Sequence, residues 1–123
     1  MNALGDVFSL EGESLTGGPA VPGPRAASPA PNENTTLAVL ATNAPLNRAE
    51  LGRLIVRGHD AFAACLRPAH TGSDGDICFA VSVGSTDARS HDATAAQPDL
   101  HNLAEAAFEA VGRAIANAVL AGS

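Results

Sequence analysis

The chain has 123 residues, of which 46% are apolar and 16% charged, so its composition is globular and its length suits one modest domain. The net charge is −6 and all seven cationic residues are arginines, so the chain lacks the basic stripe of a nucleic-acid-binding protein. Only four residues are aromatic, so the core must use Leu, Ile, Val and Ala, which favours association with a partner surface.

The two cysteines indicate a reducing compartment. Cys65 and Cys78 lie in apolar runs, which favours buried free thiols over a disulfide. The Cys and His spacing does not suggest zinc, and no apolar run reaches the roughly 20 residues that span a bilayer. The first residues lack the regions of a signal peptide. We therefore expect a cytoplasmic protein without a cofactor or a bound metal.

The first third of the chain contains two short apolar segments and a linker. Residues 3–10 predict a short strand, followed by a turn around Glu11-Gly12. A strand so close to the first residue suggests a chain that begins in the middle of a sheet. Residues 13–34 hold five of the eight prolines and three glycines, which indicates an exposed linker that is open to cleavage. Residues 35–42 predict a strand whose apolar composition would allow burial on both faces.

The rest of the chain alternates helix and strand. A capping box of Asn47 and Glu50 predicts a helix that stops before Pro68. A polar turn then leads into a strand over 77–83, and a second, Ala-rich helix is expected over about 102–120. The order after the linker is therefore β-α-β-α. Two strands and two helices cannot enclose a self-sufficient core, so we expect half of a larger layered α/β unit.

The junction Asn34-Thr35 is the first candidate site. If this bond is cut, Thr35 gains a free α-amino group beside its own hydroxyl, which pairs a base with a nucleophile. The plainer alternative is a threonine that opens a strand, and the local sequence alone favours it. The tripeptide Asn34-Thr35-Thr36 also matches a glycosylation acceptor, which means little without a secretory signal.

Four further polar residues are candidates. Asp74 and Asp76 flank a glycine before a strand and could point at one amine or hydroxyl, although a solvated turn is the plainer alternative. This loop offers too few oxygen ligands for a metal ion. Near the N-terminus, Asn2 could donate to an oxyanion. His70 could be a general base, whereas His59 fits a solvent-side or interface role; neither belongs to a nucleophile triad motif.

Together these segments resemble one family, the self-processing aminopeptidases that include L-aminopeptidase/D-esterases, β-peptidyl aminopeptidases and nylon-oligomer hydrolases. The resemblance covers most of the chain apart from 13–33 and 84–98, and it is carried by residues 2–7, by Asn34-Thr35-Thr36-Leu37 with 41–46, and by 67–71 with Asp74-Gly75-Asp76 and Phe79-Ala80. It implies an N-terminal nucleophile hydrolase of the αββα-sandwich type, whose precursor cuts itself so that a new N-terminal Ser or Thr attacks amide bonds. The Asn-Thr junction is most similar to the nylon-hydrolase branch.

The resemblance also implies a role for each candidate. Thr35 is the nucleophile and supplies the α-amine base, and Asn34 precedes the processed bond. Asn2 stabilises the oxyanion, while Asp74 and Asp76 orient the nucleophile. The chain divides into the tail of a large-subunit portion (1–12), a linker ending at the processing site (13–34) and a small β-subunit-like portion (35–123).

The family is much longer than this chain, and its N-terminal part includes a Lys or Tyr that assists the nucleophile. This chain contains neither residue type, so it resembles the C-terminal third of such an enzyme. The implied partners are a peptide or amide substrate, the missing large-subunit portion and further copies in a homo-oligomer of processed heterodimers, without nucleic acid or membrane. Two alternatives remain: a truncated, inactive fragment that acts only as an assembly subunit, and a ligand-binding or regulatory α/β module.

Overall fold

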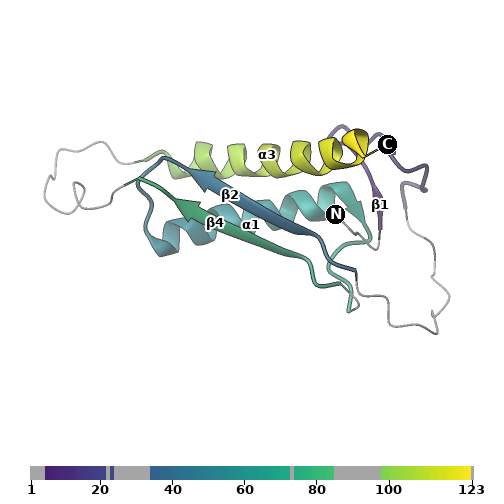
Figure 1. Cartoon of the computed structure of the whole chain (residues 1–123), viewed down its shortest axis with the longest axis horizontal. Helices are drawn as coiled ribbons and strands as arrows, with labels where there is room; N and C mark the ends of the chain where they lie inside the picture. Colours follow the sequence, from purple (N-terminus) through teal and green to yellow (C-terminus); the bar gives the residue numbers. More distant parts are fainter. Residues whose placement is uncertain (1–4, 22, 24–33, 73, 85–97, 123) are drawn as a thin grey trace, which may run out of the picture.

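The computed structural model describes residues 5–21, 23, 34–72, 74–84 and 98–122 (Figure 1). Its elements are, in chain order, β1 (Asp6–Val7), β2 (Leu37–Thr42), α1 (Arg48–Cys65), β3 (Leu66–Arg67), β4 (Ile77–Ser82) and α3 (Leu100–Ala121). The fold is mixed α/β, and its two long strands and two long helices confirm the predicted β-α-β-α order. The strand predicted over 3–10 is much shorter in its described part, where only β1 and an isolated bridge between Phe8 and Ser14 form.

Two small sheets organise the chain. The longer one is parallel and pairs β2 with β4, so that Leu37 lies opposite Ile77 and Thr42 opposite Ser82. Parallel neighbours need a crossover, and α1 supplies it. The shorter sheet pairs β1 with β3 in antiparallel fashion next to the C-terminal end of α1. The first residues of the described chain are thereby attached to the end of the helix that joins the long strands.

Local capping sets where both helices begin. The Asn47 side chain accepts a hydrogen bond from the Glu50 N–H at 3.0 Å, and the Glu50 carboxylate accepts one from the Asn47 N–H at 2.8 Å, so the predicted capping box is confirmed. Helix α3 begins two residues before the predicted start, because Asp99 caps it by accepting from the Asn102 N–H at 3.0 Å. None of the helices in the described residues combines the length and apolarity needed to cross a membrane.

The core lies between the two helices and one face of the β2–β4 sheet (Figure 1). Phe62 and Cys65 of α1 are fully buried there, and Ile115 of α3 and Cys78 of β4 are buried beside them. Both cysteines are free thiols, as the sequence predicted, and burial raises the pKa of each. Small residues on the helices allow this close packing.

The opposite face of the β2–β4 sheet is apolar and uncovered. Its side chains include Leu37, Val39, Ile77, Phe79 and Val81, which are between 39% and 70% exposed. The burial of the first long strand on both faces, which its composition would allow, is therefore not found in the described chain, because the helices cover one side only. Parallel strands are normally covered on both faces, so this surface is suited to burial against another layer.

Gly58 provides a test of the contact between α1 and the sheet. A Cβ atom at this position would lie 2.7 Å from the Cys78 sulfur and 3.4 Å from Leu40 Cδ1. We predict that Gly58→Ala lowers the free energy of unfolding by about 1–2 kcal/mol, because overpacking outweighs the gain in helix propensity. The matched control Gly52→Ala, on the same helix with nothing within 4 Å, should raise it by up to about 1 kcal/mol. Urea unfolding measures the free energy of unfolding of both variants. Equal changes in the two variants would contradict a close contact of Gly58 with the sheet.

Candidate functional site

The Asn34-Thr35 junction lies beside the turn that precedes β4. The parallel register continues backwards from the strands, so that Asn34 forms a bridge with Asp74 and Thr35 follows beside Gly75. The Gly75 N–H donates to the Asn34 carbonyl oxygen at 2.9 Å. The structure thus brings together residues that are forty positions apart in the sequence. Asn2, the predicted oxyanion donor, lies outside the described residues.

The Thr35 hydroxyl lies on the uncovered side of the sheet. A Cβ atom on Gly75 would be 2.8 Å from Thr35 Oγ1, so the hydroxyl occupies the space that the missing side chain leaves. Because side chains alternate along a strand, Thr35 shares its face with Leu37. Within the described residues, neither Asp74 nor Asp76 makes a hydrogen bond to this hydroxyl while the Asn34–Thr35 bond is intact.

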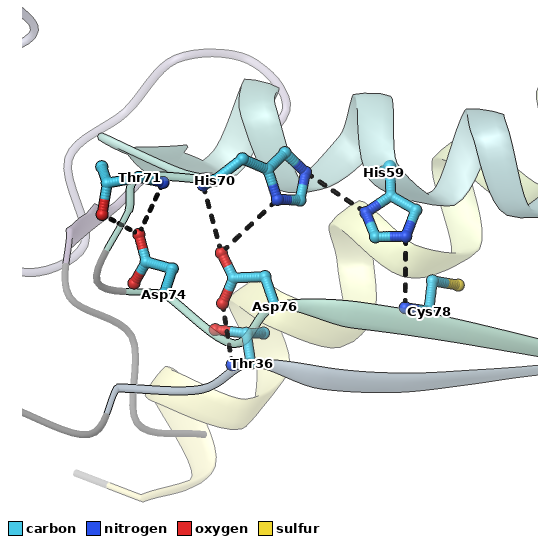
Figure 2. A network of polar contacts seen from close by, with 7 residues as sticks. All are labelled: Thr36, His59, His70, Thr71, Asp74, Asp76 and Cys78. Carbon is cyan, nitrogen blue, oxygen red and sulfur yellow. Dashed lines mark hydrogen bonds and ion pairs between the residues drawn. The ribbon is translucent and has the colours of Figure 1, made fainter.

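Asp76 holds the backbone next to Thr35 from the helix side. Its side chain is only 3% exposed, and its Oδ1 accepts a hydrogen bond from the Thr36 N–H at 2.9 Å (Figure 2). Its Oδ2 accepts from the His70 N–H at 3.4 Å and lies 3.8 Å from His70 Nδ1. This carboxylate therefore fixes the amide that directly follows the candidate nucleophile.

Asp74 makes a separate set of contacts. Its Oδ2 accepts from the Thr71 N–H at 3.1 Å and from the Thr71 hydroxyl at 2.7 Å, as Figure 2 shows. Its Oδ1 is buried without a hydrogen-bond partner in the described part of the chain, and the Thr36 hydroxyl oxygen is in the same condition. A buried oxygen without a donor costs free energy, so this is a position where a donor would be stabilised.

His59 and His70 form a contact that sequence reasoning missed. His59 Nδ1 lies 3.2 Å from His70 Nε2, and the Cys78 N–H donates to His59 Nε2 at 3.4 Å (Figure 2). Burial lowers the pKa of His59, as does the positive charge of a protonated His70, while Asp76 and Asp60 oppose the shift.

The spacing of apolar residues along α1 could have indicated that His59 faces the sheet. His59 stands three residues before the buried Phe62 and so borders the apolar face of α1. The sequence could place His70 near the aspartates, as predicted, but it could not orient the two rings toward each other. Across the described segments, no group of three or more His, Cys, Asp or Glu residues could hold a metal ion.

Comparison with known proteins gives a consistent result. Residues 5–123 match the sequence model of peptidase family S58. An uncharacterized aminopeptidase of Mycobacterium leprae is 37% identical over 99 residues, which cover 76% of this chain and 27% of that protein. Uncharacterized aminopeptidases of Mycobacterium bovis and Mycobacterium tuberculosis are 44% identical over 52 residues, or 42% of this chain and 15% of theirs. This chain thus spans about a quarter of the length of the first of these relatives. No solved structure matches it significantly.

Proposed function

We infer, because this chain belongs to peptidase family S58, that it is the part of a self-cleaving aminopeptidase that carries the nucleophile, Thr35. One observation carries the proposal: the Gly75 N–H donates to the Asn34 carbonyl oxygen at 2.9 Å, and Thr35 Oγ1 lies over the same glycine. A backbone donor thus holds the carbonyl of the bond to be cut, as in an oxyanion hole, next to the hydroxyl that would attack it.

Self-cleavage begins when Thr35 Oγ1 attacks the Asn34 carbonyl carbon. The Gly75 N–H stabilises the negative charge that develops on the carbonyl oxygen. The C–N bond then breaks, the hydroxyl proton passes to the nitrogen, and Asn34 remains as an ester on the Thr35 oxygen. Water then hydrolyses this ester, which leaves a carboxylate on Asn34 and restores the Thr35 hydroxyl beside the amine that the acyl shift has freed.

The processed enzyme uses the new terminus in turnover. The Thr35 amine accepts the hydroxyl proton while Oγ1 attacks the amide of a peptide or related substrate, and the substrate amine leaves with that proton. Water then hydrolyses the acyl-enzyme. The Asn2 amide and a backbone N–H stabilise the oxyanion. Asp76 orients Thr35 through the Thr36 N–H, and the unpartnered oxygen of Asp74 is available to the new ammonium group.

The uncovered sheet face supports an assembly with the rest of the enzyme. The first of the relatives is about four times as long as its match to this chain, so further polypeptide of the same enzyme is the proposed cover for this face. It would form the second sheet layer of an αββα sandwich, and the processed pairs would associate into a homo-oligomer.

The same exposed face favours a second candidate function, in which this chain is an inactive assembly subunit whose 34/35 bond stays intact.

Substitution of Thr35 separates these two functions. The test uses the full-length precursor, which is this chain together with the rest of the enzyme's polypeptide. We predict that Thr35→Ala abolishes cleavage of this precursor, since no hydroxyl remains to attack the carbonyl. Thr35→Ser is the matched control and should still cleave. Intact mass and N-terminal sequencing detect a product that begins Thr35-Thr36-Leu37. Cleavage at 34/35 in Thr35→Ala would rule out the mechanism.

Gly75→Ala tests whether cleavage needs the Thr35 hydroxyl in its position over Gly75. The added Cβ would lie 2.8 Å from Thr35 Oγ1 and displace the hydroxyl, so we expect cleavage to slow by about 10- to 100-fold. Gly72→Ala in the same loop, with no heavy atom within 4 Å, should cleave at the normal rate. Both rates follow from the loss of intact mass with time. Equal rates for the two variants would show that the space over Gly75 is not needed.

Phe79→Asp tests the assembly. Phe79 is 51% exposed on the open sheet face, so a charge there should weaken the two-part enzyme by about 2 kcal/mol or more while this chain keeps its own core. Val56→Asp, at a residue of α1 that is 59% exposed, should leave assembly intact. Size-exclusion chromatography of the processed enzyme measures how much of the two parts remains together. Retention of the complex in Phe79→Asp would exclude this face as the interface.

A further inference from the structure

A directional relay of two hydrogen bonds and one longer contact runs from β4 through the two histidines to Asp76. The Cys78 N–H can only donate, so His59 Nε2 must accept and the proton of a neutral His59 lies on Nδ1. That nitrogen faces His70 Nε2 at 3.2 Å, which must accept in turn. The proton of a neutral His70 therefore lies on Nδ1, which faces Asp76 Oδ2 at 3.8 Å (Figure 2).

The relay has no place for an additional proton. A proton added to His70 puts an N–H on Nε2, which then faces the Nδ1–H of His59. A proton added to His59 puts an N–H on Nε2, which then faces the Cys78 N–H. In both cases two donors confront each other and one hydrogen bond is lost. The two hydrogen bonds, from the Cys78 N–H to His59 and from His59 to His70, are both satisfied only when both rings are neutral.

Several groups around the rings affect the balance between neutral and protonated His59. Asp60 on α1 and Asp76 before β4 favour a charged His59, whereas burial and His70 oppose it, and burial is the largest effect. The rings of Phe62 and His59 make an edge-to-face contact with a centroid distance of 5.3 Å, and the Phe62 ring lies 5.9 Å from that of His70. Cys78 of β4 adds a thiol whose pKa burial raises. Since the pKa of folded His59 lies below the ordinary 6.5, its neutral form stabilises the fold fully above that pH and progressively less below it.

The far end of the relay reaches the cleavage junction. The His70 side chain is 38% exposed and is in contact with solvent, whereas the Asp76 side chain is 3% exposed. Asp76 Oδ1 holds the Thr36 N–H at 2.9 Å, so a shift of this carboxylate moves the residue bonded to Thr35. The His70 ring is thus linked to the Asn34-Thr35 junction through Asp76.

We propose that His59 and His70 are a positioning pair that holds Asp76, and with it Thr35, in the geometry for self-cleavage only while both rings are neutral. This inference rests on the proposed function, because it concerns the rate of the same cleavage. It makes the reaction sensitive to pH through two residues that do not touch the reacting atoms.

The first test is the pH profile of cleavage. The full-length precursor is made by cell-free translation, and loss of intact mass is followed between about pH 5 and 8. The wild type and the control His101→Asn, an exposed histidine of α3, should slow about tenfold or more toward the acid end. In His70→Asn and His59→Gln this decline should be largely absent. Variants that keep the wild-type profile, or that are slower by the same factor at every pH, would overturn the proposal.

The second test reads the protons directly and does not need cleavage. In the full-length Thr35→Ala variant, the nitrogen-15 shifts of both imidazoles at about pH 8 should report the proton on Nδ1. A proton on Nε2 of either ring would overturn the relay. If the wild type never cleaves, the proposed function has failed. Protons found on Nδ1 in that case would show that the relay exists but has no cleavage to control, and this outcome also overturns the inference.

Discussion

The parallel pairing of β2 with β4 is the constraint on which the rest of the structure depends. Its register sets Leu37 opposite Ile77 and continues back to Asn34 opposite Asp74, so the end of the linker and the polar turn must meet. The pairing requires the crossover helix α1, and this helix brings His59 to the inner side of the sheet. A register shift of one residue would exchange the faces of one strand and separate these groups.

The two faces of this sheet have different roles. The inner face is packed against the helices and carries Asp76, which acts on the junction from behind through a backbone amide. The outer face carries the Thr35 hydroxyl together with a continuous apolar surface. Under the proposed function, a substrate and a covering layer would therefore approach from the same side of the sheet.

Short-range sequence patterns predicted those features that depend only on neighbouring residues. The capping box at Asn47, the parallel strands' apolar runs and the burial of both cysteines followed from short-range pattern and composition. The burial of 35–42 on both faces that its composition would allow is not found in the described chain, because an apolar strand shows that its faces favour burial but does not supply the partner that buries them. The start of α3 was misplaced by two residues because Asp99 and Asn102 are both good capping residues.

The sequence by itself determined the order of the two long strands and two long helices, the start of α1 and, through resemblance, the family. Only the tertiary structure decided that Thr35 lies over Gly75 on the open face and that His59 meets His70 beneath it. The physical reason is that helix caps and strand patterns act over a few neighbouring residues. The geometry of the site depends instead on the register between strands forty residues apart and on the rotation of α1 against them, which the packing of the whole core sets.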